Sequence, residues 1–219
     1  MSAANPDSLH LRQVHIALGA QVLIDGLDVE VAPGECVTVM GPSGSGKSTL
    51  LAYLSGTLAP VFHARGAVCI GSIDVTPLAP ERRGIGILFQ DDLLFPHMSV
   101  GANLAFALPA DVKGRAARET HVAAALREAG LADFEARDPA TLSGGQRARV
   151  ALMRTLLARP RVLLLDEPFN KLDARLRQEF RAFVFDHARE RRLPTLLVTH
   201  DEQDAHAAGG PVIELGVAP

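Results

Sequence analysis

The sequence predicts an α/β fold with a mostly parallel sheet, and three observations lead to this class. Short apolar runs alternate with longer segments of helical pattern, the order expected of strands joined by helices. Most of the apolar runs are continuous, which is typical of strands covered on both faces. Two early runs alternate with polar residues, so antiparallel edge strands are expected there. At 219 residues the chain is long for one domain and short for two, and we predict a single domain.

Each element follows from a local pattern. The continuous runs predict strands at residues 36–40, 84–89, 162–165, 195–199 and 212–215, and the alternating runs predict strands at 11–16 and 27–31. Helical patterns cover residues 47–55, 114–129, 144–158 and 172–192. Gly130 is a suitable cap for the second helix, and Pro194 follows the last. Since residues 93–158 contain no convincing strand, we predict a core of residues 1–92 and 159–219 with an inserted helical subdomain at 93–158.

Composition and charge exclude several classes of protein. Lys and Arg number 22 against 25 Asp and Glu, so the net charge of −3 indicates no nucleic-acid partner. Aromatic residues make up 5% of the chain, too few for a base-stacking surface. No apolar run is long enough to span a membrane, and the first residues lack the pattern of a signal peptide. Cys36 and Cys69 have neither zinc-site nor disulfide-framework spacing, and we expect Cys36 to be a buried, inert thiol.

The strongest motif stands between the first continuous strand and the first helix. Residues 41–48 read GPSGSGKS, which fits GxxxxGK[ST]. Its glycines let successive backbone N–H groups point at phosphate oxygens, and the positive end of the helix adds to that field. Lys47 would reach the β- and γ-phosphates, and the Ser48 hydroxyl would coordinate Mg²⁺. The alternative is a glycine-rich turn that only caps a helix. The context favours a nucleoside triphosphate site.

An acidic pair ends the apolar strand at 162–165. Asp166 and Glu167 would lie at the carboxyl end of that strand, where α/β sheets bind ligands. Asp166 would hold Mg²⁺ and Glu167 would polarise the attacking water. Aliphatic strands that end in Asp are common, so the functional interpretation of this pair depends on the phosphate loop at residues 41–48. The neighbouring pair Asp91 and Asp92 is interpreted as a solvated loop in preference to a metal site.

A third motif, Leu142-Ser-Gly-Gly-Gln146, opens a helical pattern. Ser143 and Gln146 fit a capping box, which is a purely structural explanation. That explanation leaves two consecutive glycines unexplained, although each costs about 1 kcal/mol relative to Ala in a helix. Close approach of a phosphate to the helix end would explain them.

These motifs, with Gln90 and Val198-Thr-His-Asp201, occur in the order found in ATP-binding subunits of ABC transporters, which the chain resembles over nearly its whole length. The similarity is strongest to small YnjD-like importer ATPases and to thiamine and ferric-iron importer ATPases. It implies a P-loop NTPase core, ATP and Mg²⁺ as cofactors, and hydrolysis that powers uptake through a separate membrane permease. It also implies a peripheral location on the cytoplasmic face of the inner membrane, and a homodimer with two nucleotides between the subunits.

The resemblance assigns a role to each matching residue. Gln90 would touch Mg²⁺ or the attacking water, Glu167 would be the catalytic base, and His200 would stabilise charge on the γ-phosphate. Asp173 would lie at the dimer interface, in a loop where Lys171 replaces a commonly small residue. The triphosphate of one subunit would be bound by Gly41, Pro42, Ser43, Gly44, Ser45, Gly46, Lys47, Ser48 and Thr49. The γ-phosphate held by the opposite subunit would be bound by Ser143, Gly144 and Gly145 of the motif that ends at Gln146.

One position departs from the family. An aromatic residue usually stacks on adenine about thirty positions before the phosphate-loop lysine, and here that position is Leu18. Leucine can pack on a base but has no π-face, so weaker ATP binding and poorer base discrimination are expected.

The segment after Gln90, Leu93-Leu-Phe-Pro-His-Met-Ser-Val100, resembles that of importer ATPases. It implies a groove for a permease helix with Leu94, Phe95 and Met98 as apolar anchors, whereas ordinary core packing is the alternative. A periplasmic binding protein would take part indirectly. The short segment after His200 leads us to expect no regulatory domain. Two other functions stay open, an exporter ATPase of the lipoprotein-release type and a soluble ABC ATPase without a transport role.

Overall fold

A computed structural model describes residues 8–216 of the chain. Residues 1–7 lie outside this range. They make up most of the amino-terminal segment in which no signal peptide is expected. The chain divides into two compact units. Among the described residues, the core unit comprises 8–87, 161–167 and 185–216, and the helical unit comprises 88–160 and 168–184. Residues 168–184 thus cluster with the helical unit, whereas the predicted division assigns all of 159–219 to the core.

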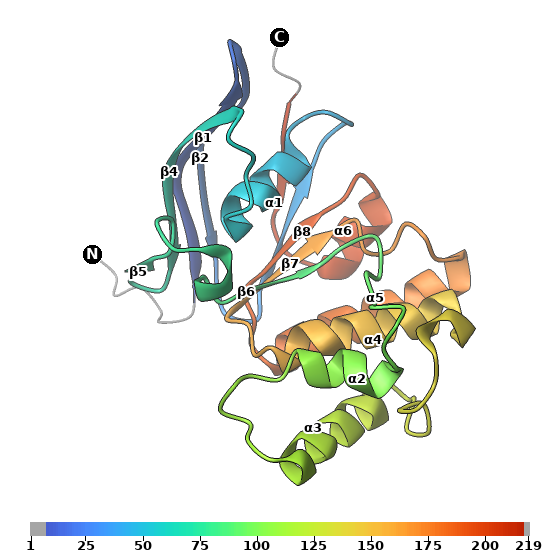
Figure 1. The fold of residues 1–219 in the computed structure, drawn as a ribbon. Helices are drawn as coiled ribbons and strands as arrows, with labels where there is room; N and C mark the ends of the chain where they lie inside the picture. The colour runs from blue at the N-terminus through green and yellow to red at the C-terminus, as the bar shows by residue number, and fades with distance from the viewer. Residues whose placement is uncertain (1–7, 217–219) are drawn as a thin grey trace. The chain divides into compact units, whose positions relative to one another are not determined.

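The continuous apolar runs form one sheet, as predicted. Its strands are β3 (Cys36–Met40), β6 (Ile85–Leu88), β7 (Val162–Asp166), β8 (Thr195–Val198) and β9 (Val212–Glu214). Within residues 8–216 their spatial order is β6-β7-β8-β3-β9 (Figure 1). β8 pairs in parallel with β7 on one side and with β3 on the other, and β3 pairs in parallel with β9. The polar residues that follow β7 and β8 therefore emerge at the same edge of the sheet.

The antiparallel strands pair in a sheet of their own. Its strands are β1 (Leu9–Leu18), β2 (Gln21–Val31), β4 (Phe62–Ile70) and β5 (Ile73–Asp74), in the order β2-β1-β4-β5. The sequence does not predict β4, because its first half, with Arg65 and Gly66, is polar and exposed. Gly66 lets β4 approach β1 closely, since a Cβ at this position would lie 2.6 Å from the Gln13 carbonyl oxygen.

The predicted long helices are present with shifts of one or two residues at their ends. α1 (Lys47–Ser55) and the short α6 (Glu202–Ala208) belong to the core unit. α2 (Val100–Phe106), α3 (Arg115–Glu128) and α4 (Gly144–Leu157) belong to the helical unit, and α5 (Ala174–Glu190) runs from the helical unit into the core unit. Two one-turn 3-10 helices complete the chain, η1 (Pro80–Arg82) and η2 (Pro139–Thr141). α2 and α6 are absent from the sequence prediction because seven residues show little helical periodicity.

The apolar core of the core unit includes α1 and strands of both sheets. Leu50 and Leu54 of α1 are fully buried, as are Val39 of β3 and Ile16 of β1. Figure 1 shows α1 between β1, β2 and β4 on one side and β3 on the other. Burial on both sides fixes α1, and therefore the glycine-rich loop that leads into it.

Candidate functional site

The glycine-rich loop between β3 and α1 folds around the side chain of Lys47. Lys47 is only 7% exposed, and its Nζ donates hydrogen bonds of 2.8 Å to the carbonyl oxygens of Gly41 and Pro42. Ser48, which follows it, is exposed at the start of α1. The loop thus places a cation inside a turn at the positive end of a helix, which favours an anion at this point.

Two features of the loop fit a bound triphosphate. A Cβ on Gly41 would lie 2.6 Å from the Leu215 carbonyl oxygen and 2.7 Å from Ser45 Oγ, so only glycine fits there. Ser45 is 3% exposed, and its hydroxyl oxygen has no hydrogen-bond partner in the protein. Gly44 and Gly46 adopt φ of 85° and 92°, the left-handed region that favours glycine. The backbone conformation, the cation and the free hydroxyl together match the needs of a phosphate chain.

The acidic pair lies at the carboxyl end of β7, as the sequence predicts. Asp166 is the last residue of β7 and Glu167 is the next. Burial, followed by repulsion from Glu167, raises the pKa of Asp166, while the charge of Lys47 acts in the opposite direction. This influence of Lys47 shows that the carboxylate and the phosphate loop share one electrostatic environment.

His200 lies in the loop after β8 and faces the acidic pair. Its Nδ1 is 3.2 Å from Oε1 of Glu167. Glu167 has a φ of 46°, which is uncommon for a residue other than glycine. It lies at a bend of the chain directly after β7. The neighbouring Thr199 hydroxyl donates to Asp204 at 2.8 Å, and this contact fixes the loop onto α6.

A pocket of about 590 Å³ lies beside the phosphate loop and His200 on the core unit. It is lined by Gly41 and Pro42 of the phosphate loop, by His200, by Met40 and Glu214 at the ends of β3 and β9, and by residues 215–216. The core unit therefore carries a cation-bearing glycine loop and a histidine that line one pocket, and an acidic pair whose Glu167 contacts that histidine.

Magnesium is the metal that these residues fit. Ser48 offers a hydroxyl and Asp166 a carboxylate, and Mg²⁺ is commonly bound by one or two carboxylates together with phosphate oxygens and water. Among the described residues no group of three or more His, Cys, Asp or Glu side chains could hold a metal ion.

The third motif, Leu142-Ser-Gly-Gly-Gln146, is the signature motif of the resemblance and lies in the helical unit. Ser143 caps α4, with its hydroxyl accepting from the Gln146 amide at 3.3 Å and the Gln146 side chain accepting from the Ser143 amide at 2.9 Å. The predicted capping box is therefore confirmed. Gly145 is also explained by packing, since a Cβ there would lie 3.3 Å from Leu176 of α5.

Three other predicted residues occupy defined places. Asp173 immediately precedes α5, and its carboxylate accepts from the Leu176 amide at 3.0 Å. Gln90 is exposed in the loop after β6. Leu18, at the end of β1 in the core unit, is 39% exposed and pairs with Gln21 of β2 and Phe62 of β4.

The predicted permease anchors are only partly exposed. Leu94, Phe95 and Met98 are half-buried, whereas their neighbours Leu93 and Phe106 are 57% and 66% exposed. The Phe95 and Phe106 rings meet edge to face with centroids 4.9 Å apart. The apolar surface of this segment is therefore carried by Leu93 and Phe106, which the sequence analysis did not single out.

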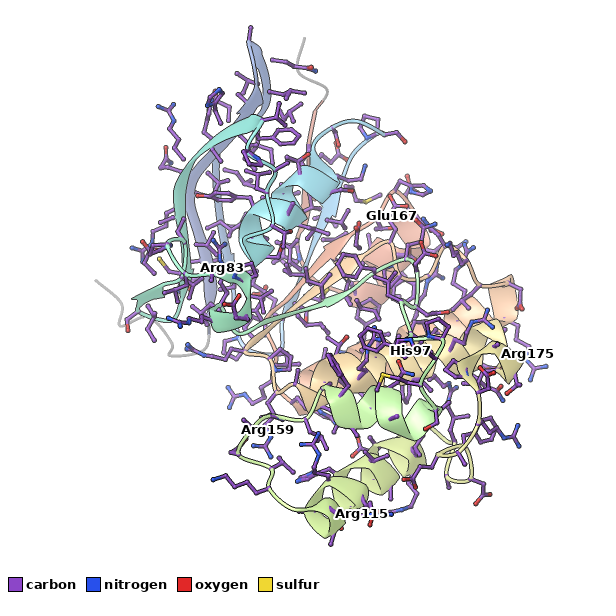
Figure 2. All side chains as sticks on the ribbon, viewed as in Figure 1. Arg83, His97, Arg115, Arg159, Glu167 and Arg175 are labelled. Atoms are coloured by element: carbon purple, nitrogen blue, oxygen red, sulfur yellow. The ribbon has the colours of Figure 1, made fainter. Side chains whose placement is uncertain are left out.

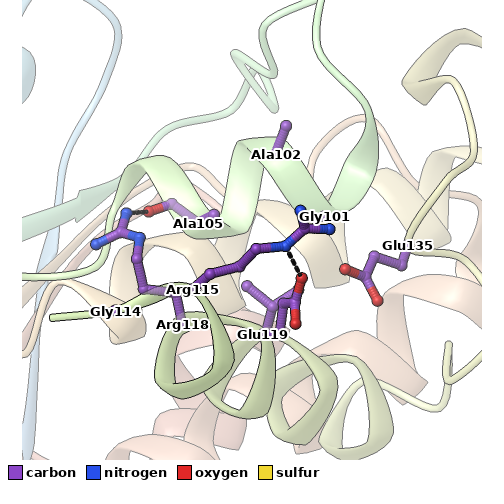
Figure 3. A pocket seen from close by; sticks show the side chains of 9 residues that line it. Gly101, Ala102, Ala105, Gly114, Arg115, Arg118, Glu119 and Glu135 are labelled. Atoms are coloured by element: carbon purple, nitrogen blue, oxygen red, sulfur yellow. Dashed lines mark hydrogen bonds and ion pairs between the residues drawn. The ribbon is translucent and has the colours of Figure 1, made fainter. Parts of the chain in front are cut away.

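A second pocket, of about 500 Å³, lies between α2 and α3 of the helical unit and contains none of the predicted site residues (Figure 3). Its two arginines already have partners. Arg115 forms an ion pair with Glu119, and Arg118 donates to the Ala105 carbonyl oxygen. We assign it no role.

Sequence reasoning missed Arg83, which lies at the far end of α1 (Figure 2). Its guanidinium donates at 2.8 Å to the carbonyl oxygens of both Tyr53 and Leu54, in the last turn of α1. It also donates to Leu78 at 2.9 Å and to Thr76 at 2.6 Å. The contacts with Tyr53 and Leu54 join residues 30 and 29 positions apart in the chain, so no local pattern predicts them.

Comparison with known proteins agrees with this geometry. Residues 24–170 match the model of the family described as ABC transporter. The chain is 50% identical to the uncharacterized ABC transporter ATP-binding protein YnjD of Escherichia coli K12, over 91% of each chain. It is 40% identical to the Fe(3+) ions import ATP-binding protein FbpC 1 of Haemophilus influenzae, over 96% of this chain and 63% of that protein. It is 44% identical to the sulfate/thiosulfate import ATP-binding protein CysA of Mycobacterium bovis, over 85% of this chain and 52% of that protein. The chain thus spans little more than half the length of these two importer proteins.

Proposed function

The chain belongs to the ABC transporter family of ATP-binding proteins, and from that premise we propose that it is the ATPase subunit of an importer. Its relatives with assigned roles are import ATP-binding proteins for ferric ions and for sulfate or thiosulfate. The observation that carries the proposal is the core-unit pocket beside the phosphate loop, because His200, which lines it, also contacts Glu167, while Lys47 is bound inside that loop. This arrangement supports hydrolysis of a triphosphate rather than binding alone.

The proposed mechanism is in-line attack of water on the γ-phosphate. The glycine-rich loop orients the triphosphate, and Lys47 stabilises negative charge on its β- and γ-oxygens. Glu167 accepts a proton from the attacking water. His200, 3.2 Å from Glu167, orients that carboxylate and would contact the γ-phosphate. Ser48 and Asp166 would hold Mg²⁺, which when bound neutralises charge between the phosphates.

We further propose that the active form is a head-to-tail homodimer. Ser143 to Gly145, at the start of α4, would contact the γ-phosphate held on the partner subunit. The first N–H groups of α4 support this contact, because a helix amino terminus attracts an anion. Gln146 completes the capping box that holds Ser143. Asp173 would lie at the same interface, and Gln90 would join the attacking water or Mg²⁺.

Integral membrane permease subunits are the proposed partners, with the chain peripheral on the cytoplasmic face of the inner membrane. Among residues 8–216 no helix is long and apolar enough to cross a membrane. The permease would dock at the segment after Gln90, where Leu94, Phe95 and Met98 are joined by the more exposed Leu93 and Phe106. A periplasmic binding protein would deliver the cargo to the permease.

Replacing Glu167 with Gln tests the hydrolytic role. Loss of the general base is expected to lower the hydrolysis rate by about 10²–10⁴-fold while ATP binding is retained. Hydrolysis would be measured by phosphate release and binding by equilibrium titration with a fluorescent ATP analogue. Glu81→Gln, an exposed acid on η1, is the matched control and should keep full activity. Near-normal turnover of the Glu167→Gln variant would refute the role of Glu167.

A further inference from the structure

The two residues after Gln90 are acidic, and each has a different cationic partner within the helical unit. Asp91 forms an ion pair with Lys171, in the loop before α5. The carboxylate of Asp92 accepts from Nε of Arg147 on α4 at 3.1 Å. The Asp91 side chain is 64% exposed, as predicted for a solvated loop, whereas that of Asp92 is only 27% exposed. The unusual Lys171 gains a physical explanation, since it pairs with a residue adjacent to Gln90.

A second arginine of α4 also binds the segment that follows Gln90. Arg154 donates at 2.7 Å to the Leu93 carbonyl oxygen and at 3.2 Å to that of Asp92. Its guanidinium also lies 5.5 Å from the centroid of the Phe95 ring. Arg147 and Arg154 are seven positions apart, so they project from one face of α4. That face holds the segment after Gln90 through both side-chain and main-chain groups.

The elements that supply these cations are also packed together. Leu172 and Leu176 lie against Gly144 and Gly145, at the start of α4. Arg147 in addition donates at 2.7 Å to the carbonyl oxygen of Leu142, within the signature motif. The segment after Gln90, the signature motif and the loop that holds Asp173 therefore meet in one cluster of the helical unit.

The ion pairs matter more for position than for stability. The side chains of Lys171 and Asp91 are 54% and 64% exposed, and exposed pairs contribute little to the free energy of unfolding. A pair of this kind can still restrict a loop to one geometry. A small change in the position of a catalytic group has a large effect on rate.

We infer that Lys171 and Arg147 are positioning residues for Gln90. Lys171 acts through Asp91 and Arg147 acts through Asp92. Together they hold Gln90 at a fixed position relative to the signature motif and to the loop of Asp173. The inference rests on the proposed function, because the position of Gln90 affects turnover only in an ATPase.

A charge swap tests the inference. The single variants Asp91→Lys and Lys171→Asp place like charges together, and each should lower kcat by about two- to fivefold. The KM for ATP should stay within about twofold, because neither residue belongs to the phosphate loop. The double variant should recover most of kcat, and Lys171→Arg should retain it. A swap of Arg115 and Glu119, an exposed pair on α3, is the matched control and should leave kcat unchanged.

Hydrogen–deuterium exchange of the nucleotide-free protein supplies a readout that needs no hydrolysis. Each single variant should increase deuterium uptake in the peptide that covers residues 89–95, and the double variant should restore protection. Unchanged uptake, or a kcat that the double variant does not recover, would overturn the inference. A parent protein that lacks ATPase activity would instead refute the proposed function, while the exchange data would still decide whether the pair holds the segment.

Discussion

Arg83 offers the sharpest test of how the core unit positions its phosphate-binding helix. The side chain is 7% exposed, and it donates hydrogen bonds to four carbonyl oxygens, two of them in the last turn of α1. A cation at this end of a helix is also favoured by the helix dipole. A Cβ on Gly56, the cap of α1, would lie 2.7 Å from Arg83 Nε, which shows how closely the two are packed.

The expected cost of Arg83→Ala follows from these contacts. Each hydrogen bond from a charged donor contributes about 1.5–3 kcal/mol, and the desolvation of the guanidinium offsets part of the sum. Burial lowers the pKa of Arg83, because partial desolvation disfavours its charged form. We therefore expect a loss of about 3 kcal/mol. At about 2–4 °C per kcal/mol for a chain of this length, Tm should fall by about 6–12 °C.

Thermal unfolding followed by circular dichroism measures this effect directly. Arg83→Lys keeps the charge but cannot reach four carbonyl oxygens at once, so its Tm should fall by about half as much. Arg82→Ala, at the exposed neighbouring position, should change the stability by no more than about 0.5 kcal/mol. A Tm for Arg83→Ala within 2 °C of the parent (about 1 kcal/mol or less) would refute the stabilising role of the Arg83 hydrogen bonds.

Three further outcomes follow from other features of the molecule. Because Leu18 lacks a π-face, GTP should support hydrolysis nearly as well as ATP, and a strong ATP preference in a competition assay would count against its role at the base. Phe95→Asp should keep nucleotide binding yet abolish co-purification with the permease, and unchanged co-purification would remove the groove assignment. Burial raises the pKa of Cys36 to about 12 and also raises that of Cys69, so neither thiol should react with a thiol reagent at pH 8 until the protein is unfolded. Fast labelling of the native protein would contradict this.

The sequence predicts the phosphate loop and its two flanking elements well, because their information is local. A continuous apolar run gives β3, the glycine pattern gives the loop, and the helical pattern gives α1. The same holds for Asp166 and Glu167, which the end of the apolar run at 162–165 places at the sheet edge. The structure adds a contact between Glu167 and His200 that joins the ends of two neighbouring strands.

Other features depend on contacts between distant residues and could not be predicted. The first half of β4 is polar, and it becomes a strand because Gly66 permits close pairing with β1. Gly145 was explained by a phosphate, but its packing against Leu176 of α5 gives it a structural role as well. The pairing of Lys171 with Asp91 has no signature in the order of the residues. Such pairs arise only after the chain has folded.

The association state of the Glu167→Gln variant tests the central claim most directly. Sedimentation velocity would be measured with and without MgATP, with Lys47→Ala as a control that should bind no nucleotide. If Gly41–Thr49 of one subunit and Ser143–Gly145 of another enclose the same triphosphate, MgATP should convert the Glu167→Gln variant from monomer to dimer and leave the control monomeric. A Glu167→Gln variant that is saturated with MgATP yet sediments only as a monomer would contradict the account.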